Sequence, residues 1–265
     1  SDLEEHLGVR LFNRTTRTVR LTEAGEQCVQ HVRHILESIQ DMEGGLGQLT
    51  NEAQGLLRIN APVSFSTKHL APVIKDFRQI NPAVGINLQL NDRKVDVVEE
   101  GFDLALRIGH LKSSSLIAKR IAPIRLVLCA SHGYLKKHGI PHHPDQLIPA
   151  HFLHYSYMSY DQDQNPMMNA LKRSIQDRGT GVSCNNGDIL VEAAIAGEGY
   201  ALQPTFLVGE AIKAGELKVI FPEFEPEPMG LYAVYPHRNL MATKLRAFID
   251  FISGYYGDIP SWDQF

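Results

Sequence analysis

The stretch Arg10–Gly25, "RLFNRTTRTVRLTEAG", decides how the rest of the chain is read. Apolar residues alternate with arginine and threonine on both sides of a polar centre, a pattern typical of a two-stranded hairpin. Its first eleven residues hold four arginines and no carboxylate: Arg10, Arg14, Arg17 and Arg20. The whole chain is acidic, with 26 Lys+Arg against 30 Asp+Glu. The sequence therefore predicts a cationic hairpin, with Arg14 and Arg17 at its tip, in an otherwise acidic protein.

Helices are expected on both sides of this hairpin. Residues 2–7 place two leucines one turn apart and end before Gly8, which is typical of a helix C-terminus. After the hairpin, Thr22 is a candidate N-cap, and Glu23 and Glu26 suit the positive end of the helix dipole. The second helix then carries apolar residues at spacings of three and four: Val29, Val32, Ile35, Ile39, Met42, Leu46 and Leu49.

This near-heptad seam favours pairing between two chains, although packing on the helix's own domain is the alternative. Gly44, Gly45 and Gly47 weaken the helix near its end.

From Leu56 onward, strand-like runs alternate with amphipathic segments. The expected strands are "LLRINA", "GINLQL", "DLALRIG", "LIAKRI", "RLVLCAS", "GVSC", "GYALQ", "LKVIF" and "GLYAVYP". The expected helices follow Ser66 or cover residues 95–100, 189–196 and 244–251. Strands separated by helices predict parallel sheet built from βαβ units, and hence an α/β fold.

Length and composition narrow the class of protein. The 265 residues suffice for one large or two small domains, and no apolar run approaches the ~20 residues that span a bilayer. The three cysteines, Cys28, Cys129 and Cys184, are widely spaced and favour a reducing cytoplasm over a disulfide framework. The start at Ser1 lacks an initiator methionine and a secretory signal, so we expect a fragment of a longer cytoplasmic protein.

The quoted stretch and its neighbours resemble the LysR-type transcriptional regulators. The matching residues are Leu3-Glu4, Leu7-Gly8, Leu11-Phe12-Asn13-Arg14 and Leu21-Thr22-Glu23-Ala24-Gly25. The resemblance continues through "LLRINAPVSFSTKHLAPVIKDFRQINP" and "NNGDILVEAAIAGEGYALQP". The stretches "LNDRKVDVVEEGFDLALRIGHLKSSSLIAKRI" and "RLVLCASHGYL" resemble the CrgA-like branch of the family. The family's first two helices and most of its recognition helix would lie before Ser1, so the resemblance implies an N-terminally truncated member.

The resemblance implies three parts. Residues 1–24 would be the remnant of a winged helix-turn-helix DNA-binding domain, and residues 25–54 a linker or dimerisation helix. Residues 55–265 would be an effector-binding domain like the type 2 periplasmic binding proteins, with two Rossmann-like subdomains. Subdomain I would comprise 55–131 and 234–265, and subdomain II 132–233. No cofactor and no membrane are implied, and the full-length protein would bind double-stranded DNA as a homodimer or homotetramer.

In this reading the basic hairpin is the wing that contacts DNA phosphates or enters a minor groove, which positions a protein without reading sequence. The expected DNA-contacting residues are Arg10, Arg14, Thr16, Arg17 and Arg20. The alternative is a solvated hairpin whose arginines pair with Glu4, Glu5 or Glu23.

The effector is expected between the subdomains, since ligands of open parallel sheets bind beyond the carboxyl ends of strands. Two segments, one after a strand of each subdomain, begin helices there and would suit a small carboxylate or other anion. The residues after "INLQL" would form a third wall of the effector site. Arg107, in "LALRIG", would neutralise a bound anion or pair with Asp103 or Glu100. Ser66 and Asn186 could instead be helix caps only, and the segment after "LQP" only a helix start. Phe65, Phe206 and Tyr155 would make part of the site apolar. The expected effector-binding residues are Val63, Ser64, Phe65, Ser66, Asn91, Asp92, Arg107, Asn185, Asn186, Asp188, Thr205 and Phe206.

Other sequence features are weaker. Six histidines lie between His132 and His154, but the proline-rich connection among them favours exposed loop residues over a metal site. Cys129 and Cys184 are expected in the core. Gly-x-Ser-x-Gly, phosphate-loop and His-Glu-x-x-His motifs are missing from the sequence, so we expect no enzyme. The alternative class is a solute-binding protein of the periplasmic type, which the basic hairpin disfavours.

Overall fold

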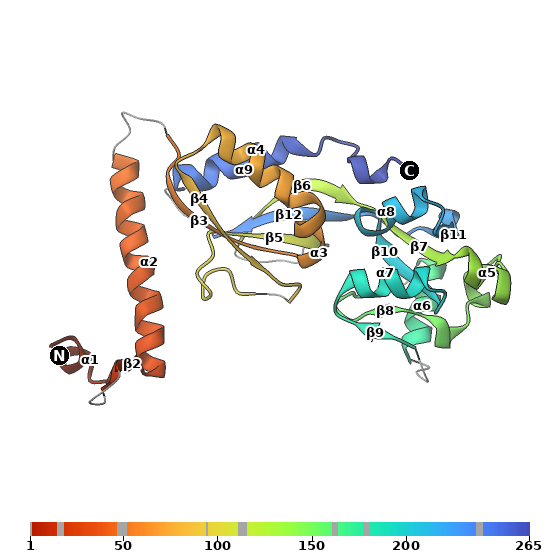
Figure 1. Ribbon diagram of the computed structural model, residues 1–265, viewed down its shortest axis with the longest axis horizontal. Helices are drawn as coiled ribbons and strands as arrows, with labels where there is room; N and C mark the ends of the chain where they lie inside the picture. Colours follow the sequence, from red (N-terminus) through yellow and green to blue (C-terminus); the bar gives the residue numbers. More distant parts are fainter. Residues whose placement is uncertain are drawn as a thin grey trace.

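The computed structural model describes residues 2–14, 19–46, 52–93, 95–110, 116–160, 164–176, 181–236 and 241–265. Figure 1 shows a small N-terminal unit, the long helix α2, and two lobes that each surround their own sheet. Within the described ranges, no helix combines the length and apolar character needed to cross a membrane.

The N-terminal unit is built around the predicted hairpin. Helix α1 (Asp2–Leu7) precedes strands β1 (Phe12–Arg14) and β2 (Val19–Leu21), which pair antiparallel. The Glu4 carboxylate accepts hydrogen bonds from the backbone N–H groups of Leu11 and Phe12, at 2.9 and 3.1 Å. The hairpin is therefore confirmed, and Glu4 fixes its first strand to α1.

Helix α2 (Glu23–Leu46) begins where the sequence predicts. The Thr22 hydroxyl accepts from the Gly25 N–H at 3.0 Å and donates to the Arg10 carbonyl at 2.6 Å, so it caps the helix and ties it to the hairpin. A Cβ on Gly25 would lie 2.0 Å from the Leu11 carbonyl oxygen, which explains why glycine stands there. In Figure 1, α2 stands apart from the two lobes.

The first lobe holds a five-stranded sheet in the order β4-β3-β5-β12-β6. Its strands are β3 (Gly55–Ala61), β4 (Val84–Leu90), β5 (Leu104–Gly109), β6 (Ile117–Ile124) and β12 (Met229–Tyr235). Strand β3 runs parallel to β4 and β5, whereas β12 runs antiparallel to β5 and β6. The predicted strands of this lobe are therefore confirmed, but the predicted parallel sheet was wrong, because the sheet is mixed.

One helical run and one C-terminal helix cover this sheet. The run consists of α3 (Val63–Phe65), a π-helical turn (Ser66–Leu70) and α4 (Ala71–Ile80). Pro72 lacks a backbone N–H and interrupts the ordinary hydrogen-bond ladder where the π turn gives way to α4. Helix α9 (Thr243–Tyr255) packs with α4, with Phe77 against Phe248 at a ring separation of 5.1 Å.

The second lobe is centred on β7, which lies between β10 and β11 and is antiparallel to both. A short parallel pair, β8 and β9, extends it. The strands are β7 (Leu126–Ser131), β8 (His154–Tyr155), β9 (Ser183–Cys184), β10 (Tyr200–Pro204) and β11 (Leu217–Ile220). The helices are α5 (His132–His138), α6 (Pro166–Gln176), α7 (Gly187–Ile195) and α8 (Thr205–Lys213). Short 3-10 turns cover Pro144–Gln146, Pro149–His151, Pro222–Phe224 and Ser261–Asp263.

The sheets move the expected boundary between the subdomains. Strand β7 belongs to the second sheet and β12 to the first, so the chain changes lobes at Arg125 and again between Phe224 and Met229, rather than at residues 131 and 234. Both strands are apolar enough to be buried in either sheet, and their composition alone does not reveal the partner.

The helix expected over residues 95–100 was wrong. The described residues there form turns, in which the Asp96 carboxylate accepts from the N–H groups of Val98 and Glu99, at 2.9 and 3.0 Å. Aspartate competes for local backbone donors and favours a turn over a continuing helix. Helices α5 and α6 were not among the expected helices, whereas α8 begins at Thr205, where a helix start after "LQP" was the alternative.

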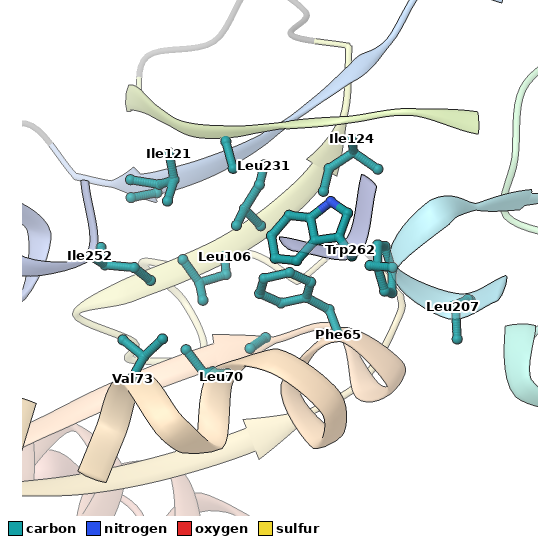
Figure 2. Close-up of a cluster of buried hydrophobic side chains, with 14 of the residues drawn as sticks. Phe65, Leu70, Val73, Leu106, Ile121, Ile124, Leu207, Leu231, Ile252 and Trp262 are labelled. Atoms are coloured by element: carbon teal, nitrogen blue, oxygen red, sulfur yellow. The ribbon is translucent and has the colours of Figure 1, made fainter. Parts of the chain in front are cut away.

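A continuous apolar core fills the first lobe and reaches the second. Figure 2 shows Leu70, Val73 and Phe65 of the helical run facing Leu106 and Leu231 of the sheet, with Leu207 of α8 approaching from the other lobe. Trp262 lies over Phe65 at the meeting point of these groups.

We expect Gly199→Ala to destabilise the second lobe, because the added Cβ would lie 1.9 Å from the His151 carbonyl oxygen. Overpacking of this kind costs about 1–3 kcal/mol, which urea unfolding would measure. The control is Gly254→Ala in α9, where nothing lies within 4 Å and alanine favours the helix. Equal stability of both variants would contradict the packing described here.

Candidate functional site

Segments that follow strands of both lobes meet at one polar contact. The helical run that starts at Val63 follows β3, and α7 follows β9. The Ser64 hydroxyl donates to the Asp188 carboxylate at 2.5 Å, which joins the two lobes directly. The Lys68 ammonium lies 3.9 Å from the other Asp188 oxygen. Ser64 and Asp188, predicted from separate segments, are therefore brought together.

A second carboxylate lies on the first-lobe side of this contact. Asp92, after β4, accepts a hydrogen bond from the Val63 N–H at 3.0 Å and interacts with the Tyr155 hydroxyl of the second lobe. Burial raises the pKa of the Asp92 carboxyl above its usual value, although both hydrogen bonds oppose the shift. Asp92 thus caps the start of the helical run and links it to the opposite lobe.

The Arg107 side chain on β5 is held by Asn60. Its Nη1 donates to the side-chain oxygen of Asn60 at 2.6 Å, and the Asn60 amide donates to the Gln89 carbonyl at 3.1 Å. Within the described part of the chain, Nη2 of Arg107 and Oδ1 of Asn91 are buried without a hydrogen-bond partner. Of the two alternative partners expected for Arg107, Asp103 accepts from the Arg58 backbone N–H and Glu100 forms an ion pair with Arg93.

The Ser66 hydroxyl and the Nε2 of Gln203 are also buried without a hydrogen-bond partner among the described residues. Gln203 lies on β10 and is 2% exposed. A Cβ on Gly187 would lie 3.2 Å from its side-chain oxygen, so Gln203 sits beside the start of α7. The sequence analysis missed Gln203, although a polar residue inside the apolar strand "YALQP" could have indicated it.

Asn186 is the N-cap of α7, because its side-chain oxygen accepts from the Ile189 N–H at 3.1 Å. Asn185, one residue earlier, is exposed. The Thr205 hydroxyl donates to the Arg125 carbonyl at 3.3 Å. It therefore helps to fix the segment in which the chain passes from one lobe to the other.

Phe65 and Phe206 point into the core rather than lining an open wall. Their rings lie 5.3 Å apart, edge to face, and both contact Trp262. His69 joins the same cluster, and burial lowers the pKa of its imidazole. Its Nε2 lies 3.1 Å from the Phe206 carbonyl oxygen, where the neutral ring can donate across the lobes.

The histidines of the second lobe form a different feature. His138 and His151 lie beside Tyr134, whose hydroxyl is 2.9 Å from the His151 Nδ1. Cavities of about 310 and 160 Å³ open on either side of His138. Over the described ranges, no three His, Cys, Asp or Glu side chains are grouped so as to hold a metal ion.

The predicted DNA-contacting residues are described only in part. Arg10 and Arg20 are exposed, and Arg14 lies on β1. Thr16 and Arg17 fall outside the described residues, as does Leu49 of the apolar seam. Along α2, Val32, Ile35 and Ile39 are exposed, and Ile35 retains 59% of its accessible surface.

Comparisons with known proteins agree with this arrangement. Residues 50–256 match the LysR substrate binding domain, and residues 1–26 match the bacterial regulatory helix-turn-helix protein, lysR family. An HTH-type transcriptional regulator of Haemophilus influenzae is 36% identical over 92% of this chain and 85% of its own. The HTH-type transcriptional activator AaeR of Escherichia coli is 30% identical over 98% of this chain and 84% of its own.

Solved structures lead to the same family. CrgA, a LysR-type transcriptional regulator from Neisseria meningitidis, aligns with a TM-score of 0.65 and 28% identity, covering 95% of this chain and 85% of that chain. The Vibrio cholerae virulence activator AphB aligns with a TM-score of 0.64 and 29% identity, over 96% and 87%.

A basic hairpin, a long helix and a two-lobed domain are the arrangement of a DNA-binding transcriptional regulator with an effector-binding domain. The chain belongs to the LysR family of bacterial transcriptional regulators, with an effector-binding domain of the type 2 periplasmic-binding-protein kind. The comparisons do not favour the alternative of a periplasmic solute-binding protein.

Proposed function

We propose that the cleft between the lobes binds a small anionic effector, and that its occupancy controls transcription. The observation that carries this proposal is the direct contact of Ser64 with Asp188 across the cleft. A ligand seated at that contact would touch both lobes and alter their relative orientation. Such a ligand shifts the equilibrium only by its difference in affinity for the two arrangements.

The preference for an anion rests on the donors around the contact. The helical run begins directly after β3 and α7 directly after β9, and helix N-termini favour negative charge. The Arg107 guanidinium and the Gln203 amide each keep a buried donor atom without a partner in the described structure. Asp92 already accepts from the Val63 N–H, which shows that this position holds a carboxylate oxygen.

In this proposal the effector's carboxylate would exchange with the protein's own carboxylates at the same donors. Direct contacts are assigned to Ser64, Ser66, Asn91, Asp92, Arg107, Asn186 and Asp188, with Val63 through its backbone and Asn185 at the rim. Phe65, Thr205 and Phe206 would act through the packing behind the cleft. Gln203 is added to the proposed site.

The N-terminal parts would turn occupancy of the cleft into control of DNA binding. We assign residues 1–24 to the winged domain, 25–54 to the linker and 55–265 to the effector domain, whose lobes exchange strands at Arg125 and after Phe224. Arg10, Arg14, Thr16, Arg17 and Arg20 would contact phosphates of double-stranded DNA in the cytoplasm. No cofactor is required, and the names of the relatives as regulators support a non-catalytic role.

The exposed apolar seam of α2 supports assembly as a homodimer, or as a homotetramer of two such pairs. Apolar residues at heptad-like spacing become buried when two such helices pair. Val32, Ile35 and Ile39 are exposed to 42%, 59% and 42% in the single chain.

For the cleft, we expect Ser64→Tyr to abolish stabilisation by ligand while leaving a folded protein. Thermal melting would be followed with acetate, succinate and benzoate, each paired with its amide. Binding to the folded state raises the melting temperature by mass action, so a carboxylate but not its amide should stabilise the wild type. The matched control is Thr67→Tyr, because Thr67 is exposed on the same helical run. A full response in Ser64→Tyr would place the ligand elsewhere.

For the seam, Ile35→Asp with Ile39→Asp should dissociate the α2-mediated dimer, because burying unpaired carboxylates in an apolar interface is costly. Analytical ultracentrifugation would give the mass, and circular dichroism would check the fold of the lobes. His31→Asp with Glu26→Asp is a milder control on exposed positions of the same helix. An unchanged mass in the seam variant would assign the main interface to another surface.

For the wing, Arg14→Ala with Arg17→Ala should weaken binding to all DNA sequences alike. The dependence of log K on log salt should flatten by up to about two phosphate contacts. Lys136→Ala with Lys137→Ala removes the same charge from α5 and should leave the slope unchanged. An identical slope in both variants would show that the wing arginines do not reach the phosphates.

A further inference from the structure

The segment Pro260–Phe265 has two buried residues, Pro260 and Trp262. It follows α9 through Gly257, whose φ of 67° lies in the left-handed region and turns the chain back. Trp262, the single tryptophan of the sequence, is only 6% exposed. A large aromatic residue buried in a terminal tail implies that the tail has a defined seat.

That seat is made by both lobes. From the first lobe, the Trp262 ring contacts His69, Tyr256 and Phe65, at centroid separations of 4.8, 5.0 and 5.8 Å. From the second lobe it contacts Phe206 of α8, at 6.5 Å. Figure 2 shows Trp262 between Phe65 and the ribbon of α8 that carries Leu207.

The backbone of the segment is fitted to α8 as well. A Cβ on Gly209 would lie 2.9 Å from the Trp262 carbonyl oxygen and 3.4 Å from the Phe265 ring. The Arg125 guanidinium in turn lies over the Phe265 ring, with Cζ 5.7 Å from the ring centroid. Arg125 stands at the first crossing between the lobes and forms a bidentate ion pair with Glu225 at the second.

The seat is also adjacent to the cleft. Phe65, the ring below Trp262, stands between Ser64 and Ser66 in the chain, and Ser64 makes the contact with Asp188. His69 touches Trp262 and bonds the Phe206 carbonyl across the lobes. A movement of the cleft lip at Ser64 therefore changes the surface on which Trp262 rests.

We propose that Pro260–Phe265 is an interlobe strap that holds α8 of the second lobe against the start of the helical run and so favours the closed cleft. The proposal deepens the effector function above and rests on it for its biological meaning. Separation of the lobes would remove α8 from Phe65 and His69, and Trp262 could then keep its contacts with one lobe only. The closed arrangement would be stabilised by the aromatic contacts and by the apolar area that becomes exposed when the lobes separate.

Pulsed electron spin resonance between the lobes tests the strap without any effector. Labels would be placed at Ile80 of α4 and Glu216 after α8, both exposed, in a background with Cys28→Ser and Cys184→Ser. Cys129 can remain, because it is fully buried and burial raises the pKa of its thiol to about 12, which suppresses labelling.

Trp262→Ala should shift the interlobe distances to longer values and broaden their distribution. Trp262→Phe should retain the wild-type distribution, because a ring is kept and the indole N–H has no partner among the described residues. Ile259→Ala, 72% exposed just before the strap, is the matched control and should change nothing.

Gly209→Ala provides an independent variant that leaves Trp262 intact. Its methyl group would displace the strap from α8, while alanine favours the helix itself. Longer distances in Gly209→Ala would support the strap even if Trp262→Ala unfolds. Wild-type distances in Gly209→Ala and in any folded Trp262→Ala would overturn it and leave the segment as core packing alone. The carboxylate response of the cleft is a separate measurement, so failure of either proposal is recognisable.

Discussion

The architecture of the effector domain depends on two adjacent crossings of the chain between sheets. Arg125 and Glu225 stand at these crossings, and the guanidinium binds both carboxylate oxygens, at 2.7 and 2.8 Å. A bidentate pair of this kind fixes direction as well as distance. It ties the segment before β7 to the segment before β12, so the two lobes share one defined connection. Everything that lies between the lobes is positioned relative to it.

Two layers of contacts, one polar and one aromatic, join the lobes near this connection. On one side, the cleft joins the lobes through polar contacts, Ser64 with Asp188 and Asp92 with Tyr155. Behind it, Phe65, Phe206 and Trp262 join them through aromatic packing. In the proposed function, the polar contacts would exchange partners with a ligand while the aromatic layer resists separation of the lobes, which suits a domain that switches between few orientations. A change in the relative orientation of the lobes would then alter the position of α2 and of the DNA-binding end of the regulator.

The sequence predicted much of this fold because its strands are apolar runs bounded by turn residues, and Thr22 and Asn186 proved to be the caps expected of them. It did not predict which sheet receives β7 or β12, since each strand is buried enough to fit both. Residues 95–100 have helical spacing, but Asp96 captures the backbone donors of a turn. Ser64, Asp92 and Asp188 were predicted to lie near one another from their places after strands, and Ser64 does contact Asp188. Gln203 and Trp262 were missed because their importance comes from contacts between distant segments, which periodicity does not encode.

The most direct test of the account is a double-mutant cycle between Ser64 and Asp188, measured by urea unfolding of Ser64→Ala, Asp188→Ala and the double variant. A hydrogen bond to a charged group contributes about 1.5–3 kcal/mol, so the cycle should give a favourable coupling energy of about 1 kcal/mol or more after allowance for the exposure of Asp188. The same coupling should fall when a stabilising carboxylate is bound, because the ligand takes over the contact. Additive effects, within about 0.5 kcal/mol, with and without ligand would contradict the claim that the lobes meet and respond at this point.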